Sequence, residues 1–445
     1  MSVPLRAAPN DETRPGDGAD MYRLIEELFP ICRSITGEGL RQTLHRIAQH
    51  VPLVLHEVPS GTKAFDWTIP NEWNVRGAYI ATLDGRRIVD FANSNLHLVQ
   101  YSVPVDRIVG RDELLQHIHT MPERPAWIPY RTSYYSAGWG FCLSERQART
   151  LTEPAYRVVI DAGLKPGYLT YGELAIPGEG EAEFLFSCHC CHPSLANDNL
   201  SGIAVATWLA QRIAAAPRRM SYRFLFIPGT IGSLAWLAAN EALVPRVTHG
   251  LVLSCLGDPG AFTYKQSRRG DAEIDRILTH VLRHGGAPHL VQPFIPYGYD
   301  ERQYCSPGFD MPVGCLMRSP NGAYPEYHSS ADDLSLVRPD CLQQSLDMLW
   351  QVVEAVEGNL VYQSLNPKGE PQLGKRGLYR AMGGHQTQEF DQMTLLWVLN
   401  LADGEHSLLD MAERAQLPLQ KLRAAAEALL EAKLIASAVA SAHRG

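Results

Sequence analysis

The feature that most constrains the fold is an alternation of short apolar runs with helical patterns in the middle of the chain. The apolar runs have the length and composition of buried strands and lie at Tyr156–Ile160, Phe184–Ser187, Tyr222–Ile227 and Gly250–Ser254. Helical spacing of apolar residues occurs between several of them, at Ile203–Ala215 and Ile231–Leu243. This alternation predicts an α/β domain with a mixed or parallel sheet flanked by helices. Ligands of such open sheets bind beyond the carboxyl ends of the strands.

The segments on either side of this region have different residue patterns, which predict additional domains. Residues 53–145 carry short alternating runs rich in Trp, Pro and Tyr, which predicts an inserted, mostly β domain. Residues 1–20 lack an apolar segment and are expected to be a disordered leader. The α/β domain is then formed by residues 21–52 and 146–365, and residues 366–445 form a winged-helix-like domain.

Composition narrows the class of protein. The 445 residues carry a formal charge of −8, so no basic field favours nucleic acid or an anionic membrane. Nine cysteines without paired spacing favour a reduced compartment, and the protein is expected to be cytoplasmic. The longest uncharged run, residues 224–240, contains Pro228, Gly229 and Gly232, which indicates a strand and a turn rather than a membrane span.

The C-terminal segment predicts three short helices. Glu389–Asp403 is amphipathic, Ser407 caps a second helix with Asp410 at its third position, and Leu417–Ala436 is rich in alanine and leucine. This pattern resembles a winged helix. Residues 389–445 hold five Lys or Arg against eight Asp or Glu, a poor basis for binding DNA phosphates. Packing or formation of a homo-oligomer is the better expectation.

A cluster of metal-binding residue types follows the strand that ends near Ser187. His189 and His192 fall in the loop, and Asp198 follows in the sequence SCHCCHPSLANDNLSG. Imidazole and carboxylate are the usual ligands of a catalytic zinc. The alternatives are histidines that are merely buried and hydrogen-bonded, and a structural zinc held by Cys188, Cys191 and the two histidines.

A second group lies downstream, in PNGAYPEYHSSADDL. Glu326 and His328 are two residues apart, so in an extended segment they share one face. Alone, such a pair is more often a surface pair than a site. Together with His192 and Asp198, His328 completes a three-ligand set for a metal ion.

These motifs carry a family resemblance. The runs CHPSLANDNLSG, PGTIGS, DERQYCSPGFDMPVG and PEYHSSADDL resemble the landmarks of a bacterial family of aminopeptidase-like proteins, related to the zinc exopeptidases. The resemblance implies N-terminal helices, a β insertion, a phosphorylase/hydrolase-like α/β domain and a C-terminal winged helix. It also implies His192 or His189 as the first metal ligand, Asp198 as a carboxylate able to bridge two metals, His328 as the last histidine and Asp258 as a further carboxylate. His192 is favoured over His189.

One position departs from that family. Its members typically read PETIGS where this chain has Gly229 and Thr230, so the glutamate that acts as general base is missing. A general base contributes about 10²- to 10⁴-fold to a rate. Glu326 is the nearest substitute in sequence, and Asp300 and Glu301 are alternatives. Without the glutamate pair, one zinc is expected rather than two.

Three functions remain open. The first is a zinc-dependent aminopeptidase-like hydrolase of a peptide or amide bond in a small substrate. The second is acyl transfer or cyclisation in specialised metabolism, and the third is a non-catalytic binding protein. Arg268 and Tyr327 are candidates for substrate binding, although Arg268 and Arg269 also suit a solvated loop. The aromatic stretch PAWIPYRTSYYSAGWGF suits either a substrate cleft or packing between domains.

Overall fold

The computed structural model describes residues 17–378 and 390–438, which form two compact units. The first unit is made of residues 17–269 and 292–346, and the second of residues 270–291 and the described residues from 347 onward. Helix α1 (Asp17–Leu28) begins the described part, so most of the expected leader lies outside it. Among the described residues, no helix combines the length and the apolar character that crossing a membrane requires.

A mixed sheet forms the centre of the first unit. Its parallel strands are, in order, β12 (Ser221–Ile227), β11 (Glu183–His189), β13 (Val247–Leu253) and β16 (Val313–Met317). Antiparallel strands extend it on both sides, namely β10 (Tyr168–Ile176) and β1 (Val54–Pro59) beside β12, and β14 (Phe262–Lys265) beside β16. Every residue of β11 is buried, as expected of a central strand covered on both faces. The predicted α/β fold with a mixed sheet is confirmed.

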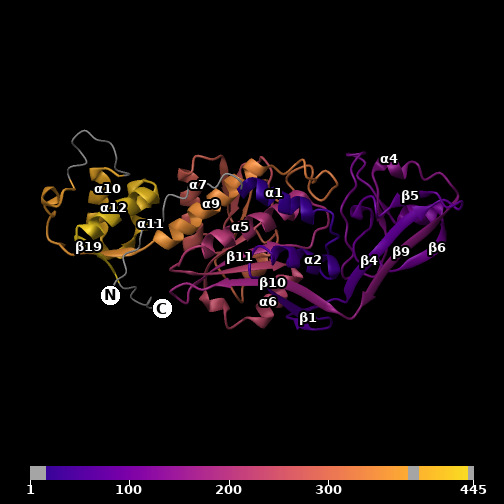
Figure 1. Cartoon of the computed structure of the whole chain (residues 1–445), viewed down its shortest axis with the longest axis horizontal. Coiled ribbons are helices and arrows are strands. Elements are labelled where there is room, and N and C mark those ends of the chain that lie inside the picture. Colours follow the sequence, from indigo (N-terminus) through magenta and orange to yellow (C-terminus); the bar gives the residue numbers. More distant parts are fainter. Residues whose placement is uncertain (1–16, 379–389, 439–445) are drawn as a thin grey trace. The chain divides into compact units, whose positions relative to one another are not determined.

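Helices cover both faces of this sheet. Figure 1 shows α1 and α5 (Gly202–Ala214) on one side and α6 (Ile231–Ala239) on the other. The apolar residues of α5 lie on most of its circumference because it packs against α1 as well as against the sheet. The remaining helices of this part are α2 (Glu38–Ile47), η2 (Ala196–Ser201), η3 (Val244–Arg246) and α8 (Glu301–Tyr304). Helix α9 (Pro339–Gly358) begins in the first unit, and its residues from 347 onward belong to the second.

The β-rich segment is built on a four-stranded antiparallel sheet in the order β5-β4-β9-β6. These strands are β4 (Glu72–Ala81), β5 (Arg87–Asp90), β6 (Val105–Gly110) and β9 (Ala155–Lys165). Its smaller elements are β2 (Lys63–Ala64), β3 (Trp67–Thr68), η1 (Asn95–His97), α3 (Arg111–Gln116), β7 (Ile118–His119), β8 (Phe141–Cys142) and α4 (Glu145–Ala148). Tyr156–Ile160, expected in the central sheet, belongs to β9 here. Its burial alternates along the strand, as in an antiparallel sheet with one solvated face.

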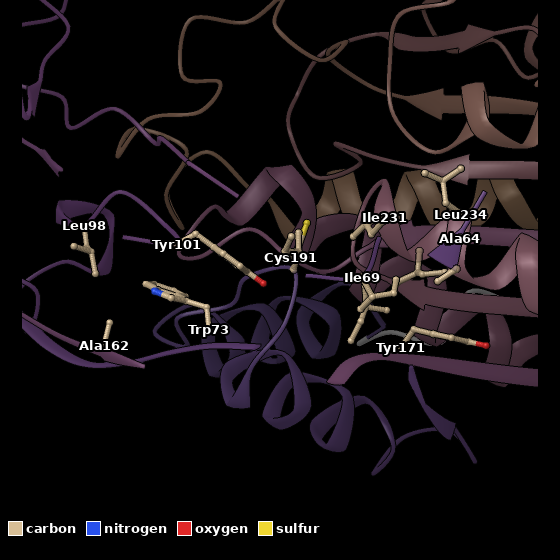
Figure 2. Packing of buried hydrophobic residues seen from close by; sticks show 14 of the residues in the cluster. Ala64, Ile69, Trp73, Leu98, Tyr101, Ala162, Tyr171, Cys191, Ile231 and Leu234 are labelled. Atoms are coloured by element: carbon tan, nitrogen blue, oxygen red, sulfur yellow. The ribbon is translucent and has the colours of Figure 1, made fainter. Parts of the chain in front are cut away.

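A single buried apolar cluster connects the β-rich segment with the central sheet and its helices. Figure 2 shows Trp73 and Tyr101 of the β-rich segment near Cys191, which follows β11. The rings of Trp73 and Tyr101 stack with centroids 5.7 Å apart, and Trp73 Nε1 donates to the Ser102 carbonyl at 3.0 Å. Ile231 of α6 belongs to the same cluster. The β-rich segment is therefore part of the core that surrounds the strand ends.

The second unit contains the C-terminal helices and a small sheet in the order β18-β17-β19. Its elements are α7 (Glu273–His284), β15 (His289–Gln292), β17 (Val361–Ser364), η4 (Leu373–Arg376), α10 (Gln392–Leu401), β18 (Asp403–Ser407), α11 (Leu408–Ala415), α12 (Leu419–Glu431) and β19 (Ile435–Ser437). Ser407 and Asp410 form the predicted capping box of α11. Helices α10, α11 and α12 together with the three-stranded sheet are the parts of a winged helix, which confirms the predicted class of this domain.

Candidate metal centre

Three of the predicted ligands are placed by β11 and the turn that follows it. His189 is the last residue of β11, His192 lies in the next loop, and Asp198 lies in η2. The backbone amides of Asn197 and Asp198 donate to the Asp332 carboxylate at 2.6 and 3.0 Å. Because both donors are fixed by one buried acceptor, the turn holds Asp198 in a single orientation.

The Asn199 side chain fixes the other side of the turn. Its Nδ2 donates to the Leu253 carbonyl at 2.9 Å, and its Oδ1 accepts from the backbone amide of Cys255 at 3.1 Å. A Cβ on Gly202 would lie 2.3 Å from Asn199 Oδ1, so only glycine fits there. Asn199 and Gly202 of the NDNLSG run are thus required by the close packing of this turn against the end of β13.

The predicted histidines converge on the Asp198 carboxylate. His189 Nε2 lies 2.7 Å and His192 Nδ1 lies 3.7 Å from Asp198 Oδ1, whereas His328 Nε2 lies 3.0 Å from Asp198 Oδ2. The ligand atoms of His189, His192 and Asp198 all lie within 4.8 Å of one another. His328 approaches from the other edge of the carboxylate. The structure therefore brings together both histidines between which the sequence left the choice open.

The donor atoms fit a divalent cation. His192 Nδ1 is buried without a hydrogen-bond partner among the described residues, and the buried atoms His328 Nε2 and Asp198 Oδ2 lie 3.0 Å apart without hydrogen-bond geometry. Buried polar atoms are nearly always hydrogen-bonded, so three unsatisfied atoms around one point indicate a missing partner. Imidazole nitrogens with a carboxylate oxygen form the donor set that zinc prefers. A possible metal site of His and Asp residues is present at this point.

The protonation states also suit metal binding. Burial holds the pKa of His192 well below its usual range, so the imidazole is neutral near pH 7. Burial opposes ionisation of Asp198, but the neighbouring His192 and the hydrogen bond from His189 outweigh it and keep the pKa of Asp198 well below its ordinary value. Neutral imidazole and ionised carboxylate are the forms that bind metals.

Aromatic rings hold the histidines in place. Tyr327 stacks on His328 with centroids 3.9 Å apart, and Tyr130 meets His192 and His328 edge-on at 5.1 and 5.0 Å. The Tyr130 backbone amide also donates to the His328 carbonyl at 2.8 Å. Tyr327, predicted to bind substrate, lies against the metal-site histidine, and Tyr130 contributes an aromatic wall from the β-rich segment.

Asp258, Glu326 and Arg268 lie outside this cluster. Both Asp258 oxygens accept hydrogen bonds, from Asn197 Nδ2 at 2.9 Å and from Ser319 Oγ at 2.6 Å among others, so the carboxylate is occupied by the surrounding turns. The Glu326 carboxylate is half-buried and has no hydrogen bond or ion pair to another described residue. Arg268 Nη1 pairs with Asp310 Oδ1 at 2.7 Å. None of the three belongs to the group formed by His189, His192 and Asp198.

A pocket of about 400 Å³ opens beside the histidines. It is lined by Ile35, Trp67, Tyr130, Arg131, Thr132, Tyr134, Tyr135, His192, Gly229, Thr230, Ile231, Leu234, Gly298, Tyr299, Arg302 and His328. Tyr134 and Tyr135 come from the aromatic stretch for which the sequence left open a cleft or a packing role. Trp139 of the same stretch stacks on His117 at 3.7 Å instead, so the stretch serves both purposes.

Tyr299 occupies the space in front of Gly229. A Cβ on Gly229 would lie 1.9 Å from Tyr299 Cε1, so residue 229 has no room for any side chain. The Tyr299 ring lies 3.8 Å from the His189 ring, and its hydroxyl lies 3.4 Å from Cys191 Sγ. Where the family resemblance implies a glutamate, this chain places the half-buried ring of Tyr299. The sequence showed the glycine but gave no signal for the residue that replaces the lost side chain.

The neighbours of Tyr299 were alternatives for the general base. Glu301 forms an ion pair with Lys265 and accepts the Tyr299 backbone amide at 3.1 Å, so it holds the Tyr299 segment. Asp300 is fully buried; its Oδ1 accepts from Ser233 Oγ at 2.8 Å, and its Oδ2 has no partner among the described residues. Burial raises the pKa of Asp300 from 3.8 to about 6.

The raised pKa of Asp300 makes stability depend on pH. Its proton is bound more tightly in the folded chain than in the unfolded chain between pH 3.8 and 6, so the free energy of unfolding falls as the pH rises through this window. Asp300→Asn is expected to stabilise the protein at pH 8 by about 1–2 kcal/mol and to have little effect at pH 4. Chemical denaturation at both pH values measures this. Equal effects at both pH values, or the same result for exposed Asp66→Asn, would contradict it.

Comparison with known proteins identifies relatives over almost the whole chain. Residues 22–359 match the family described as "Domain of unknown function (DUF4910)", and residues 360–437 match a winged helix-turn-helix family. A Clostridium acetobutylicum protein, assigned provisionally to polysaccharide biosynthesis with an aminopeptidase-like domain, is 48% identical over 418 residues, covering 94% of this chain and 96% of its own.

Solved structures give the same result. A crystal structure from Clostridium acetobutylicum, provisionally assigned as a peptidase, is 46% identical with a TM-score of 0.91, covering 95% of this chain and 98% of its own. BSAP, a zinc aminopeptidase from Bacillus subtilis, is 13% identical with a TM-score of 0.56, covering 77% of this chain and 94% of its own, and shares the fold. The chain therefore belongs to the DUF4910 family, and it combines an aminopeptidase-like fold with a C-terminal winged helix-turn-helix.

Proposed function

We propose that the protein is a zinc-dependent hydrolase that cleaves a peptide or amide bond in a small substrate. The observation that carries this proposal is the convergence of His189, His192 and His328 on Asp198 beside a pocket of about 400 Å³. The aminopeptidase-like fold of the chain and of its Clostridium relatives supports it. The family resemblance also supports Asp198 as the central ligand.

The residues of the site would have separate roles in metal binding and in orientation of the ligands. His189, His192 and Asp198 would hold one zinc, with His328 at the second carboxylate oxygen of Asp198. When bound, zinc supplies Lewis-acid activation of an acyl carbonyl or of an attacking water. Tyr130 and Tyr327 keep the imidazoles oriented through ring contacts, and the pocket beside them would hold the substrate. Orientation of this kind strengthens electrostatic stabilisation of the developing charge.

A second function, acyl transfer or cyclisation, is favoured by Gly229. Tyr299 fills the place of the glutamate that would activate water, and no Asp or Glu lines the pocket among the described residues. Without such a base, attack by water is slow, whereas a neutral amine of a second substrate or of the same molecule needs less activation. Glu326, two residues before His328, stays the proposed proton relay.

Metal analysis combined with turnover tests the proposal. Purified protein is dialysed against zinc, and bound metal is measured by plasma mass spectrometry. One zinc per chain is expected, with EDTA-sensitive release of p-nitroaniline from a panel of aminoacyl and N-acyl aminoacyl p-nitroanilides. Zinc without hydrolysis, but with transfer of the acyl group to hydroxylamine, supports the second function. Absence of zinc binding overturns both.

A further inference from the structure

The pocket beside the histidines contains two cations and no anion among its described lining residues. Arg131 comes from the β-rich segment and Arg302 from α8, and both side chains are exposed. Neither forms an ion pair with a described carboxylate. The charge of Arg302 acts on the buried Asp300, but the two do not bond to each other. His192 and His328 are the other titratable side chains of the lining besides tyrosines.

Other arginines of this unit, by contrast, have carboxylate partners. Arg268 and Arg269, the sequence-based candidates for a carboxylate clamp, both bind Asp310, and Arg76 binds Asp161. Arginine offers a planar fork that matches carboxylate and phosphate oxygens. Two such groups that share a pocket without a protein partner are free to bind an anion of the substrate. The predicted role of Arg268 is therefore better placed at Arg131 and Arg302.

The same lining argues against a free amino terminus on the substrate. A protonated α-amine needs an acidic or carbonyl partner, and no carboxylate side chain lines the described pocket. Two arginines would instead repel it. Aromatic side chains cover another part of the wall, with the rings of Trp67 and Tyr135 5.2 Å apart. Such a wall suits a planar or apolar body next to the anionic group.

We propose that Arg131 and Arg302 bind a carboxylate or phosphate of the substrate, which is therefore an anionic amide with a blocked amino group rather than an aminoacyl compound with a free ammonium. This inference rests on the proposed function, because it places the amide of that substrate at the histidines. The shared chemistry is a pair of anionic oxygens. Binding of N-benzoylglycine and of phenyl phosphate distinguishes a carboxylate from a phosphate.

The test measures binding to EDTA-treated protein, so it does not depend on the metal. N-benzoylglycine, its neutral amide N-benzoylglycinamide, the cation glycine anilide and phenyl phosphate are titrated by calorimetry. N-benzoylglycine or phenyl phosphate is expected to bind at least about 10-fold more tightly than the neutral and cationic probes. The tighter of the two anions identifies the substrate group, and either supports the proposal.

Variants locate the binding. Arg131→Ala and Arg302→Ala should each weaken anion binding about 3- to 10-fold, and the double variant more, with unchanged melting temperature because both side chains are exposed. Arg86→Ala, an exposed arginine that does not line the pocket, should bind as wild type. Equal affinity for neutral and anionic probes, or anion binding retained by the double variant, overturns the proposal. A protein that binds zinc and hydrolyses amides with no preference for anions refutes this inference alone. A protein that binds anions through the arginines but takes up no zinc refutes the proposed function alone.

Discussion

Asp198→Asn is expected to remove zinc from the protein and to abolish turnover. Both Asp198 oxygens face histidines, Oδ1 toward His189 and His192 and Oδ2 toward His328, so the substitution removes the only carboxylate of the cluster and its charge. We expect zinc affinity to fall by more than about 100-fold, since even residues that only orient ligands are worth 10- to 100-fold. Plasma mass spectrometry measures the bound zinc, and competition with a fluorescent chelator measures the zinc affinity. Release of p-nitroaniline measures turnover.

Two further variants make this result specific. Asp332→Asn keeps every histidine and Asp198 but weakens the acceptor of the Asn197 and Asp198 amides, so a 10- to 100-fold loss of zinc affinity is expected. His289→Ala removes an exposed imidazole far from β11 in sequence and should leave zinc binding unchanged. If Asp198→Asn retained one zinc per chain with wild-type affinity, the metal would have to be held elsewhere.

Gly229→Ala is expected to destabilise the protein by about 3 kcal/mol. Its Cβ would lie 1.9 Å from Tyr299 Cε1, and the Tyr299 ring cannot move freely because it packs on the His189 ring. The cost should shrink by at least about 2 kcal/mol in a Tyr299→Ala background, which gives a double-mutant coupling by urea denaturation. Gly308→Ala is the matched control, because its Cβ meets no atom within 4 Å. Equal costs at positions 229 and 308 would contradict the packing argument.

The paired variant Gly229→Glu with Tyr299→Ala should supply the general base for water that residue 229 lacks. Removing the phenol opens the space in front of residue 229, and the new carboxylate can act as a general base toward water. Hydrolysis of p-nitroanilides is expected to rise by about 10²- to 10⁴-fold over wild type. Tyr299→Ala alone serves as the control, because it opens the same space without a base. Equal rates for the two variants would show that water activation does not limit hydrolysis.

Much of the site could be predicted because its residues follow strand ends. His189, His192 and Asp198 lie just after an apolar run, and that position in an α/β sheet already indicates a ligand site. His328 is predicted as a metal ligand from the motif that contains it and because a catalytic zinc needs a third protein ligand. The structure adds that His189 and His192 both reach the carboxylate, which spacing alone left undecided.

The remaining features depend on contacts between distant segments. Tyr299 fills the space left by Gly229 although 70 residues separate them, and no local pattern encodes that contact. Asp258 resembles a metal ligand in sequence, but nearby amides and Ser319 occupy its oxygens. The sequence of Tyr156–Ile160 predicts a strand but not the sheet to which it belongs, because apolar alternation does not specify the partner strand. In each case the sequence does not show which distant segments come into contact in the folded chain.

The contacts of Tyr130 mean that the β-rich segment and the central sheet together form one candidate site. Tyr130 belongs to the former, yet its amide holds the carbonyl of His328 and its ring meets two of the three histidines. Arg131, Tyr134 and Tyr135 follow on the same strip of chain and face the same pocket. Substitutions on this strip can therefore change the wall of the pocket while the histidines and Asp198 stay unchanged, whereas excising the segment would remove that wall together with the contacts that hold His328.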